Sequence, residues 1–218
     1  MHENKTLAIF GGTGNTGKYF QKMALEKGYK VRLMARNKVL NFEKHSNLEI
    51  IQGDFSNFNA IKETITGSDI VICMGSSLKS KESRLMYSFA TFLYTAMKET
   101  GVKKLIYQAG ALNYLPNSNK ILSVWLMRNT LGHLSGAIGS LLDHERTFDI
   151  FEEKYKKNDI QVMVTLPGAM GLIEGELSKD LVVHNSVVWT QSRFMDVAKF
   201  TLNAIDKEEY WNQYLYIA

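Results

Sequence analysis

The sequence has little cysteine and little proline, and both shortages narrow what the protein can be. Its 218 residues include one cysteine, Cys73, so an internal disulfide is excluded and a cytoplasmic protein is expected. Only two prolines occur, and no repeat, low-complexity tract or linker divides the chain. A hydrophobic fraction of 45% and a charged fraction of 22% are typical of globular proteins. We therefore predict one domain over residues 1–218.

Charge of one sign and long apolar runs are also scarce. The formal net charge is +4 and the basic residues form no long run, so a nucleic-acid partner is not expected. The longest apolar stretch, residues 121–142, is interrupted by Arg128, Asn129 and His133, which makes it a poor membrane span. Residues 1–6 are polar and lack the layout of a signal peptide. We expect a small molecule, and no membrane, as the partner.

Strand-like apolar runs alternate with helix-like segments along most of the chain. Strands are predicted at residues 7–10, 31–35, 48–52, 69–74, 103–108 and 160–166. Helices are predicted at residues 18–27, 58–65 and 83–100, and a longer helical region at 121–157 is broken near the glycines at 132, 136 and 139. A short strand at 186–190, a helix at 193–206 and a final strand at 213–217 complete the pattern. This alternation predicts an α/β fold, a Rossmann-like doubly wound parallel sheet with a small C-terminal substrate portion.

A glycine-rich turn joins the first predicted strand to the first predicted helix. Gly11, Gly14 and Gly17 recur at three-residue intervals within this setting. Glycine lets the backbone turn tightly and come close to a pyrophosphate, and the helix N-terminus offers free N–H groups and the positive end of the helix dipole. We therefore predict that this turn binds a dinucleotide.

The end of the second predicted strand indicates which dinucleotide is bound. Sites that prefer NAD place an acid about 20 residues after the glycine turn, to hold the ribose 2′-hydroxyl. This chain has Arg36 there instead, and a guanidinium suits the 2′-phosphate of NADP(H). Asp54 follows the third strand at the same edge of the sheet. Two roles remain open for it: accepting a hydrogen bond from the adenine amine, or supporting the start of the next helix.

These segments resemble the atypical short-chain dehydrogenase/reductase superfamily, in particular its NmrA-like and biliverdin reductase B (flavin reductase) group. The resemblance rests on residues 9–17, 28–36, 53–54 and 69–75, and residues 101–106, 143–144 and 194–198 also fit. It implies that NADP(H) lies across the glycine turn, the ends of the second to fourth strands, and the loops after the fifth and sixth. The implied cofactor-binding residues are Gly11, Thr13, Gly14, Asn15, Thr16, Arg36, Asp54, Phe55, Met74, Gly75, Ser76, Gln108, Ala109, Gly110, Pro167 and Gly168.

The proton-handling residues of that family are missing from this chain. Its members use a Tyr-x-x-x-Lys pair after the fifth strand or, in the flavin reductase branch, a serine there and a histidine after the sixth. The only Tyr-x-x-x-Lys spacing, Tyr94 with Lys98, precedes the fifth strand, and Gly110 and Ala169 occupy the other two places. Two functions remain open: an NADPH-dependent reductase of a planar or carbonyl substrate, flavin- or quinone-like, and a non-catalytic NADP(H)-sensing binding protein.

Few other side chains are candidates for chemistry. Tyr114 follows the fifth strand and is the one catalytic residue we predict, because it is placed to reach a substrate above the nicotinamide. Tyr107 and Cys73 are expected to pack in the core. No metal site is predicted, because no spacing among the three histidines after residue 130 suits one. Solvated or capping roles are expected for these histidines, which are His133, His144 and His184.

The apolar stretch at residues 121–138 has three open interpretations. It could form a lid over the substrate pocket, a surface for a homodimer, or part of the core. Met163, Met170 and Trp189 are expected in the core or in the lining of a pocket.

Overall fold

The computed structural model describes residues 5–36, 45–77, 84–116, 118, 121–132, 137–169 and 171–218. Its main strands are β1 (Thr6–Phe10), β2 (Lys30–Ala35), β3 (Leu48–Gln52), β4 (Ile70–Cys73), β5 (Lys104–Gln108), β6 (Gln161–Pro167), β8 (Val183–His184) and β10 (Tyr214–Ile217). They form one eight-stranded sheet in the order β3-β2-β1-β4-β5-β6-β10-β8. All neighbours are parallel except β8, which runs antiparallel to β10.

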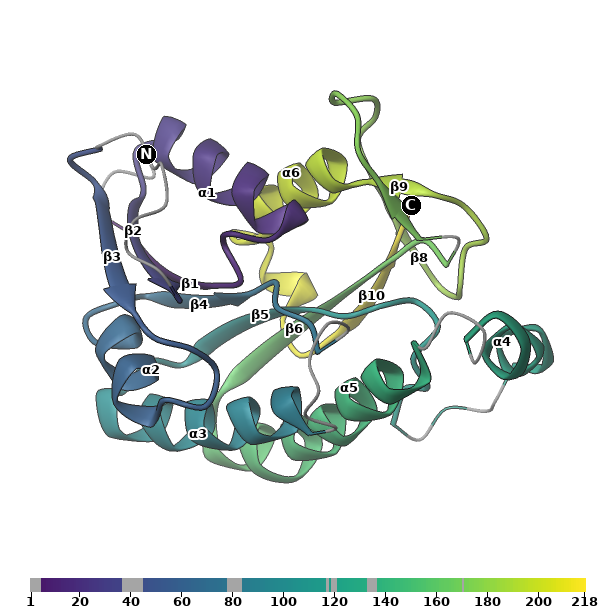
Figure 1. Cartoon of the computed structure of the whole chain (residues 1–218), viewed down its shortest axis with the longest axis horizontal. Helices are drawn as coiled ribbons and strands as arrows, with labels where there is room; N and C mark the ends of the chain where they lie inside the picture. Colours follow the sequence, from purple (N-terminus) through teal and green to yellow (C-terminus); the bar gives the residue numbers. More distant parts are fainter. Residues whose placement is uncertain are drawn as a thin grey trace.

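Helices cover both faces of this sheet, as Figure 1 shows. One face carries α1 (Asn15–Glu26) and α6 (Phe194–Ala204), and the other carries α2 (Phe58–Ile65), α3 (Leu85–Thr100) and α5 (Ile138–Ile150). The short α4 (Leu122–Met127) stands apart, to the right of α5 in Figure 1, and continues into a π-helical turn at Arg128–Gly132. A second π-helical turn, Phe151–Tyr155, and two 3-10 turns, Lys156–Asn158 and Glu208–Tyr210, complete the helical elements of the described residues.

The sheet is doubly wound because its central strands are apolar on both faces. All four residues of β4 are buried. Alternate residues join two separate hydrophobic clusters: Phe10 and Cys73 pack toward α2 and α3, whereas Ile9 and Ile72 pack toward α1 and α6. The predicted single-domain Rossmann-like fold is confirmed, since strands buried on both faces require helices on both sides.

The C-terminal third departs from the prediction in its small strands. The strand predicted at residues 186–190 is wrong, since the strand in this region is β8 at Val183–His184. Two further strands, β7 (Leu172–Ile173) and β9 (Ser192–Arg193), form a separate parallel pair. Each has only two residues, which is too short to leave a periodic signal in the sequence.

The helical region at residues 121–157 is broken, as predicted, into α4, α5 and the π-helical turns between and after them. Helix α1 begins at Asn15 rather than at residue 18, because the end of the glycine turn is already helical. Of the apolar candidates, Met163 is in the core, Trp189 is exposed, and Met170 lies outside the described residues.

The role expected for His144 is wrong. Its side chain is buried, and its Nδ1 atom lies 2.7 Å from the hydroxyl oxygen of Tyr107. Desolvation lowers the pKa of His144 from 6.5 to about 4, so the imidazole is neutral at physiological pH. The neighbouring Asp143 is also buried, and its carboxylate accepts hydrogen bonds from the N–H groups of Met86 and Tyr87 at the start of α3.

The predictions for four other residues have mixed outcomes. The core positions of Tyr107 and Cys73 are confirmed, and burial raises the pKa of the Cys73 thiol to about 12, so this thiol stays protonated. His184 is half-buried in β8, and His133 lies outside the described residues.

The buried His144 predicts a loss of stability in weak acid. Because its folded pKa is below the ordinary value, the unfolded chain binds the proton more tightly, and stability falls as the pH drops from 6.5 to about 4. A shift of this size amounts to at most about 3 kcal/mol. Urea unfolding at pH 7 and pH 4.5 should show a larger acid-induced loss for the native chain than for His144→Gln. Equal losses in the two proteins would contradict the assignment.

Candidate functional site

The glycine turn brings the backbone of β1 against the end of β4. Gly11 has a φ of 77°, and a Cβ there would lie 2.7 Å from backbone atoms of Met74 and Gly75. A Cβ at Gly17 would lie 2.2 Å from the carbonyl oxygen of Gly11. Only glycine fits these two positions, and the start of α1 therefore packs directly onto the strand end.

The N-terminus of α1 is open to an anion. Gly14 is the N-cap residue in an extended conformation, and the first turn contains no acidic residue. Thr13, Gly14 and Asn15 are exposed, whereas Thr16 is buried. The first N–H groups of a helix have no partner within the helix and sit at the positive end of its dipole. The predicted pyrophosphate site thus has both the free donors and the field that it needs.

The ends of β2 and β3 place a cation and a carboxylate at the same edge. Arg36 is exposed, and its carbonyl oxygen accepts a hydrogen bond from the Gln52 side chain at 3.4 Å. The Asp54 carboxylate accepts hydrogen bonds from the Ser56 hydroxyl at 2.6 Å and the Ser56 N–H at 2.9 Å. These bonds, and the nearby Arg36 charge, lower the pKa of Asp54.

The role of Asp54 in starting the next helix is therefore confirmed. It shapes the turn that leads into α2, where the Asn57 side chain accepts a hydrogen bond from the Ala60 N–H. Its contact with adenine stays a prediction. Asn37 and Lys38, which follow Arg36, lie outside the described residues.

The end of β4 meets the turn after β3 through a close contact. A Cβ at Gly75 would lie 2.3 Å from the ring of Phe55, and this ring packs on Phe89 with 4.7 Å between centroids. Met74 is buried and Ser76 is exposed. The backbone after β4 is thus held close to the glycine turn, as the predicted cofactor site requires.

The ends of β5 and β6 carry two buried polar atoms. The Gln108 side chain donates through Nε2 to the Thr16 hydroxyl at 3.3 Å, which ties β5 to α1. Its Oε1 atom, and the hydroxyl of the adjacent Thr165, are buried and find no hydrogen-bond partner in the part of the chain that the structure describes. Buried polar atoms are nearly always satisfied. An amide oxygen and a hydroxyl are groups with which a carboxamide forms hydrogen bonds, and these two lie at the strand ends where the nicotinamide is predicted.

The loop after β6 is packed as tightly as the glycine turn. A Cβ at Gly168 would lie 2.4 Å from the carbonyl oxygen of Thr190. The Ala169 N–H donates to the Val188 carbonyl at 2.9 Å. Pro167 and Gly168 are buried, as is Ala109 in the loop after β5. The segment around residue 188 therefore forms a wall beside the predicted nicotinamide position.

A cavity of about 190 Å³ lies next to that wall. Its lining combines amide and hydroxyl groups with apolar and aromatic side chains from the loop after β5, the start of α4, the loop after β8, and β10. The lining residues are Asn113, Tyr114, Leu115, Ser118, Ile121, Val124, Asn185, Ser186, Val187 and Tyr216. The predicted residue Tyr114 is therefore placed at a ligand-sized space.

Four of the residues that shape this cavity were not predicted from the sequence. The Asn113 side chain accepts a hydrogen bond from the Gly110 N–H at 3.1 Å and donates to the Leu141 carbonyl at 2.8 Å, which fixes the loop after β5. Tyr216 lines the cavity, and burial raises its pKa, so its hydroxyl stays protonated. The other two residues, Arg128 and Glu145, form an ion pair behind the cavity lining.

This ion pair clamps the loop after β5 between α4 and α5. Arg128 donates to the Leu112 carbonyl at 2.9 Å and pairs with the Glu145 carboxylate, which also accepts from the Tyr114 N–H at 2.7 Å. The guanidinium lies 4.0 Å from the centroid of the Tyr114 ring. Arg128 is 6% exposed at its side chain. A buried charge must be paired. The lone arginine within an apolar run of the sequence is therefore the signal that could have identified Arg128 as part of an ion pair.

Tyr94 and Lys98 are not brought into this site. Both lie on α3, where the Lys98 ammonium sits 5.8 Å from the centroid of the Tyr94 ring. Within the described ranges, no three of the metal-binding residue types gather into a site. The same ranges contain no helix that is long and apolar enough to cross a membrane.

The fold and this edge of the sheet define a dinucleotide-binding protein of the Rossmann type. Residues 11–170 match the model of the NAD(P)H-binding family, and the chain belongs to that family. A curated relative, the Photosystem II assembly factor Ycf39 of Trieres chinensis, is 26% identical over 214 residues, covering 95% of this chain and 62% of that protein. The chain therefore spans less than two thirds of that relative's length.

Solved structures share the same fold. A short-chain dehydrogenase/reductase from Veillonella parvula in complex with NADP has a TM-score of 0.75 at 16% identity, over 98% of this chain and 94% of that one. A protein described as an NADH-flavin reductase from Streptococcus pneumoniae has a TM-score of 0.75 at 17% identity, over 98% and 99%. These likenesses show that the fold is shared, and the family match shows NAD(P)H binding.

The Arg128–Glu145 pair predicts a strong coupling between two side chains. Arg128→Met leaves a mostly buried carboxylate without its cation and should lower the free energy of unfolding by about 3 kcal/mol. The double variant Arg128→Met, Glu145→Leu should lose less than the sum of the two single losses, by at least about 1 kcal/mol. Urea unfolding of the four proteins measures this coupling. Additive losses would show that the pair does not hold the loop.

Proposed function

We propose that the protein is an NADPH-dependent reductase of a small planar carbonyl substrate. The observation that carries this proposal is the position of a cavity of about 190 Å³ against the loop that follows β8, a loop whose Val188 carbonyl accepts a hydrogen bond from the Ala169 N–H after β6. The open end of α1, the exposed Arg36 and the unsatisfied Gln108 oxygen lie along the same edge of the sheet. A dinucleotide laid along that edge would present its nicotinamide to whatever fills the cavity. The single buried cysteine supports a reducing cytoplasm as the compartment.

Arg36 supports NADP(H) over NAD(H). Its exposed guanidinium leaves the end of β2 beside the Asp54 turn, and its charge reaches that carboxylate. A planar guanidinium holds a phosphate through two parallel hydrogen bonds, which a ribose hydroxyl cannot match.

The chain's own groups have separate roles in this proposal. The N–H groups at the start of α1 hold the pyrophosphate, and Gln108 with Thr165 orients the carboxamide. NADPH, when bound, supplies the hydride. Tyr114 lines the cavity and would hold a proton near the substrate carbonyl, while the clamp through Glu145 and Arg128 fixes the backbone and ring of that tyrosine. The packed loops at Gly168 and Asn113 hold the backbone beside the reacting face in place.

A second candidate is a binding protein that senses NADP(H) without turnover. The positions of Gly110 and Ala169 favour it, because neither residue carries a group that could transfer a proton. Assays of NADPH oxidation with a range of electron acceptors separate the two candidates. Oxidation of NADPH by any acceptor in the presence of the protein supports the reductase, and tight binding without oxidation supports the sensor.

Gly14→Val should abolish dinucleotide binding without unfolding the protein. The extended backbone of Gly14 suits any residue, and its nearest obstacle to a Cβ is the Gly11 oxygen at 3.1 Å. The new side chain therefore occupies the space for the pyrophosphate. Calorimetry with NADPH should show no binding, while thermal unfolding stays cooperative with a midpoint lowered by only about 2–4 °C, because valine is a poorer N-cap residue than glycine. The matched control is Gly139→Val, where a Cβ has nothing within 4 Å; retained binding in Gly14→Val would place the cofactor elsewhere.

Arg36→Ala should weaken NADPH binding and leave NADH binding unchanged. Hydrogen bonds to a charged group contribute about 1.5–3 kcal/mol, which corresponds to about a 10- to 100-fold rise in Kd. Titration calorimetry with both dinucleotides measures the ratio. Lys30→Ala, an exposed cation at the opposite end of β2, is the control for a general charge effect. A similar loss for both dinucleotides would remove Arg36 from the phosphate site.

A further inference from the structure

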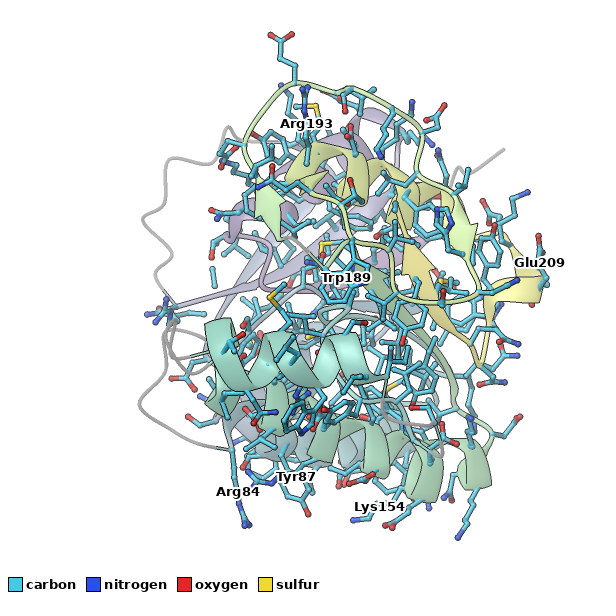
Figure 2. The ribbon with its side chains drawn as sticks, turned by 90° about the vertical axis from the view of Figure 1, so that its right-hand side faces the viewer. Arg84, Tyr87, Lys154, Trp189, Arg193 and Glu209 are labelled. Carbon is cyan, nitrogen blue, oxygen red and sulfur yellow. The ribbon has the colours of Figure 1, made fainter. Side chains whose placement is uncertain are left out.

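Helix α4 presents an apolar stripe to solvent. Leu122 is 77% exposed, Trp125 48% and Leu126 57%. Their spacing of three and four residues puts them on one face of the helix. Trp189, also exposed, lies on the side of the molecule that carries α4, as Figure 2 shows. A cluster of large apolar side chains in solvent is uncommon and marks a binding surface. The core interpretation of this stretch is therefore wrong for these residues.

The helix cannot turn this stripe inward. Its opposite face holds Val124, which is buried, and Arg128, which is bound to Leu112 and Glu145. Rotating α4 would bring the guanidinium out of its ion pair and leave the Glu145 carboxylate mostly buried without a cation. The exposure of Leu122, Trp125 and Leu126 is thus fixed by the clamp.

The stripe is continuous with the cavity through Ile121. This residue lines the cavity and is 43% exposed, and it directly precedes Leu122. An apolar cavity of about 150 Å³ holds one benzene ring, so a volume of about 190 Å³ is large enough for one substituted ring. The exposed amide of Asn185 lies in the same lining and suits a ring oxygen.

We propose that the substrate class is a one-ring carbonyl compound with an alkyl chain. The ring fills the cavity, and the chain leaves past Ile121 and lies along Leu122, Trp125 and Leu126. This rests on the reductase function proposed above. For a quinone, the ring gains a hydride from NADPH and a proton from solvent and becomes the hydroquinone, while NADPH becomes NADP⁺. The chain takes no part in the chemistry and contributes only to binding.

A homologous series of acceptors tests the role of the chain. The probes are 2-alkyl-1,4-benzoquinones from methyl to hexyl, used below the concentration at which they aggregate. Each added methylene that buries about half of its surface on α4 should raise kcat/KM about twofold. The five methylenes between methyl and hexyl should then raise it about 30-fold. A flat dependence on chain length would overturn the proposal while leaving the reductase function intact.

Substitutions on α4 locate the chain. The double variant Leu122→Gln, Leu126→Gln should retain its activity on the methyl compound and lose most of the gain with chain length. The control is Leu177→Gln, which changes an exposed leucine in a segment attached to α6 through the Ser178–Asp196 hydrogen bonds, in the opposite helix layer. An unchanged gain in the α4 variant would overturn the proposal.

A binding measurement separates this inference from the reductase function. Titration calorimetry with 4-alkylphenols, which accept no hydride, should show affinity that rises with chain length in the native chain and much less in the α4 variant. That result without quinone turnover would reject the reductase and keep the binding site. Analytical ultracentrifugation tests whether the stripe is instead a dimer interface. A native dimer that becomes a monomer in the α4 variant would assign the stripe to a second copy of the chain and overturn the proposal.

Discussion

The close approach of backbone to backbone at the carboxyl edge of the sheet is the constraint on which the site depends. Side chains are excluded at Gly11 and Gly17, where a Cβ would come within 2.2–2.7 Å of backbone atoms. The end of β1, the start of α1 and the end of β4 can therefore meet without intervening groups. The same contact leaves the N–H groups of α1 facing solvent with no acidic neighbour in the first turn. The ability of the α1 N-terminus to bind an anion therefore depends on backbone packing as much as on local sequence.

The other half of the site is built from side chains. Asn113, Arg128 and Glu145 come from three segments and fix the loop after β5 through hydrogen bonds and an ion pair. Each of these buried polar groups gives up its hydrogen bonds to water. It therefore stabilises the fold only when its protein partners are all in place. This half therefore depends on contacts between residues that are far apart in the chain, in contrast to the local glycine turn.

That difference explains what the sequence could predict. The parallel sheet follows from apolar strands such as β4, and the glycine spacing with its strand and helix follows from local pattern. The position of Gln108 beside Thr16 also follows from topology, because parallel strands end at one edge. In contrast, the burial of His144 and the pairing of Arg128 with Glu145 depend on how α5 packs, which local periodicity does not encode. The two-residue strands β7 and β9 depend on their mutual pairing, which links residues 20 positions apart in the chain.

The chemistry of the cavity agrees with a substrate that needs little help from the protein. Its titratable side chains in the described lining are Tyr114 and Tyr216, and burial keeps Tyr216 protonated by raising its pKa. A tyrosine hydroxyl can donate a hydrogen bond to a carbonyl oxygen without giving up its proton. An easily reduced ring would require only this polarisation and correct placement, because the hydride comes from the cofactor and the proton can come from water. In the proposed reductase, the glycine and alanine at positions 110 and 169 would be compatible with turnover, and specificity would come from how the cavity and α4 hold the acceptor.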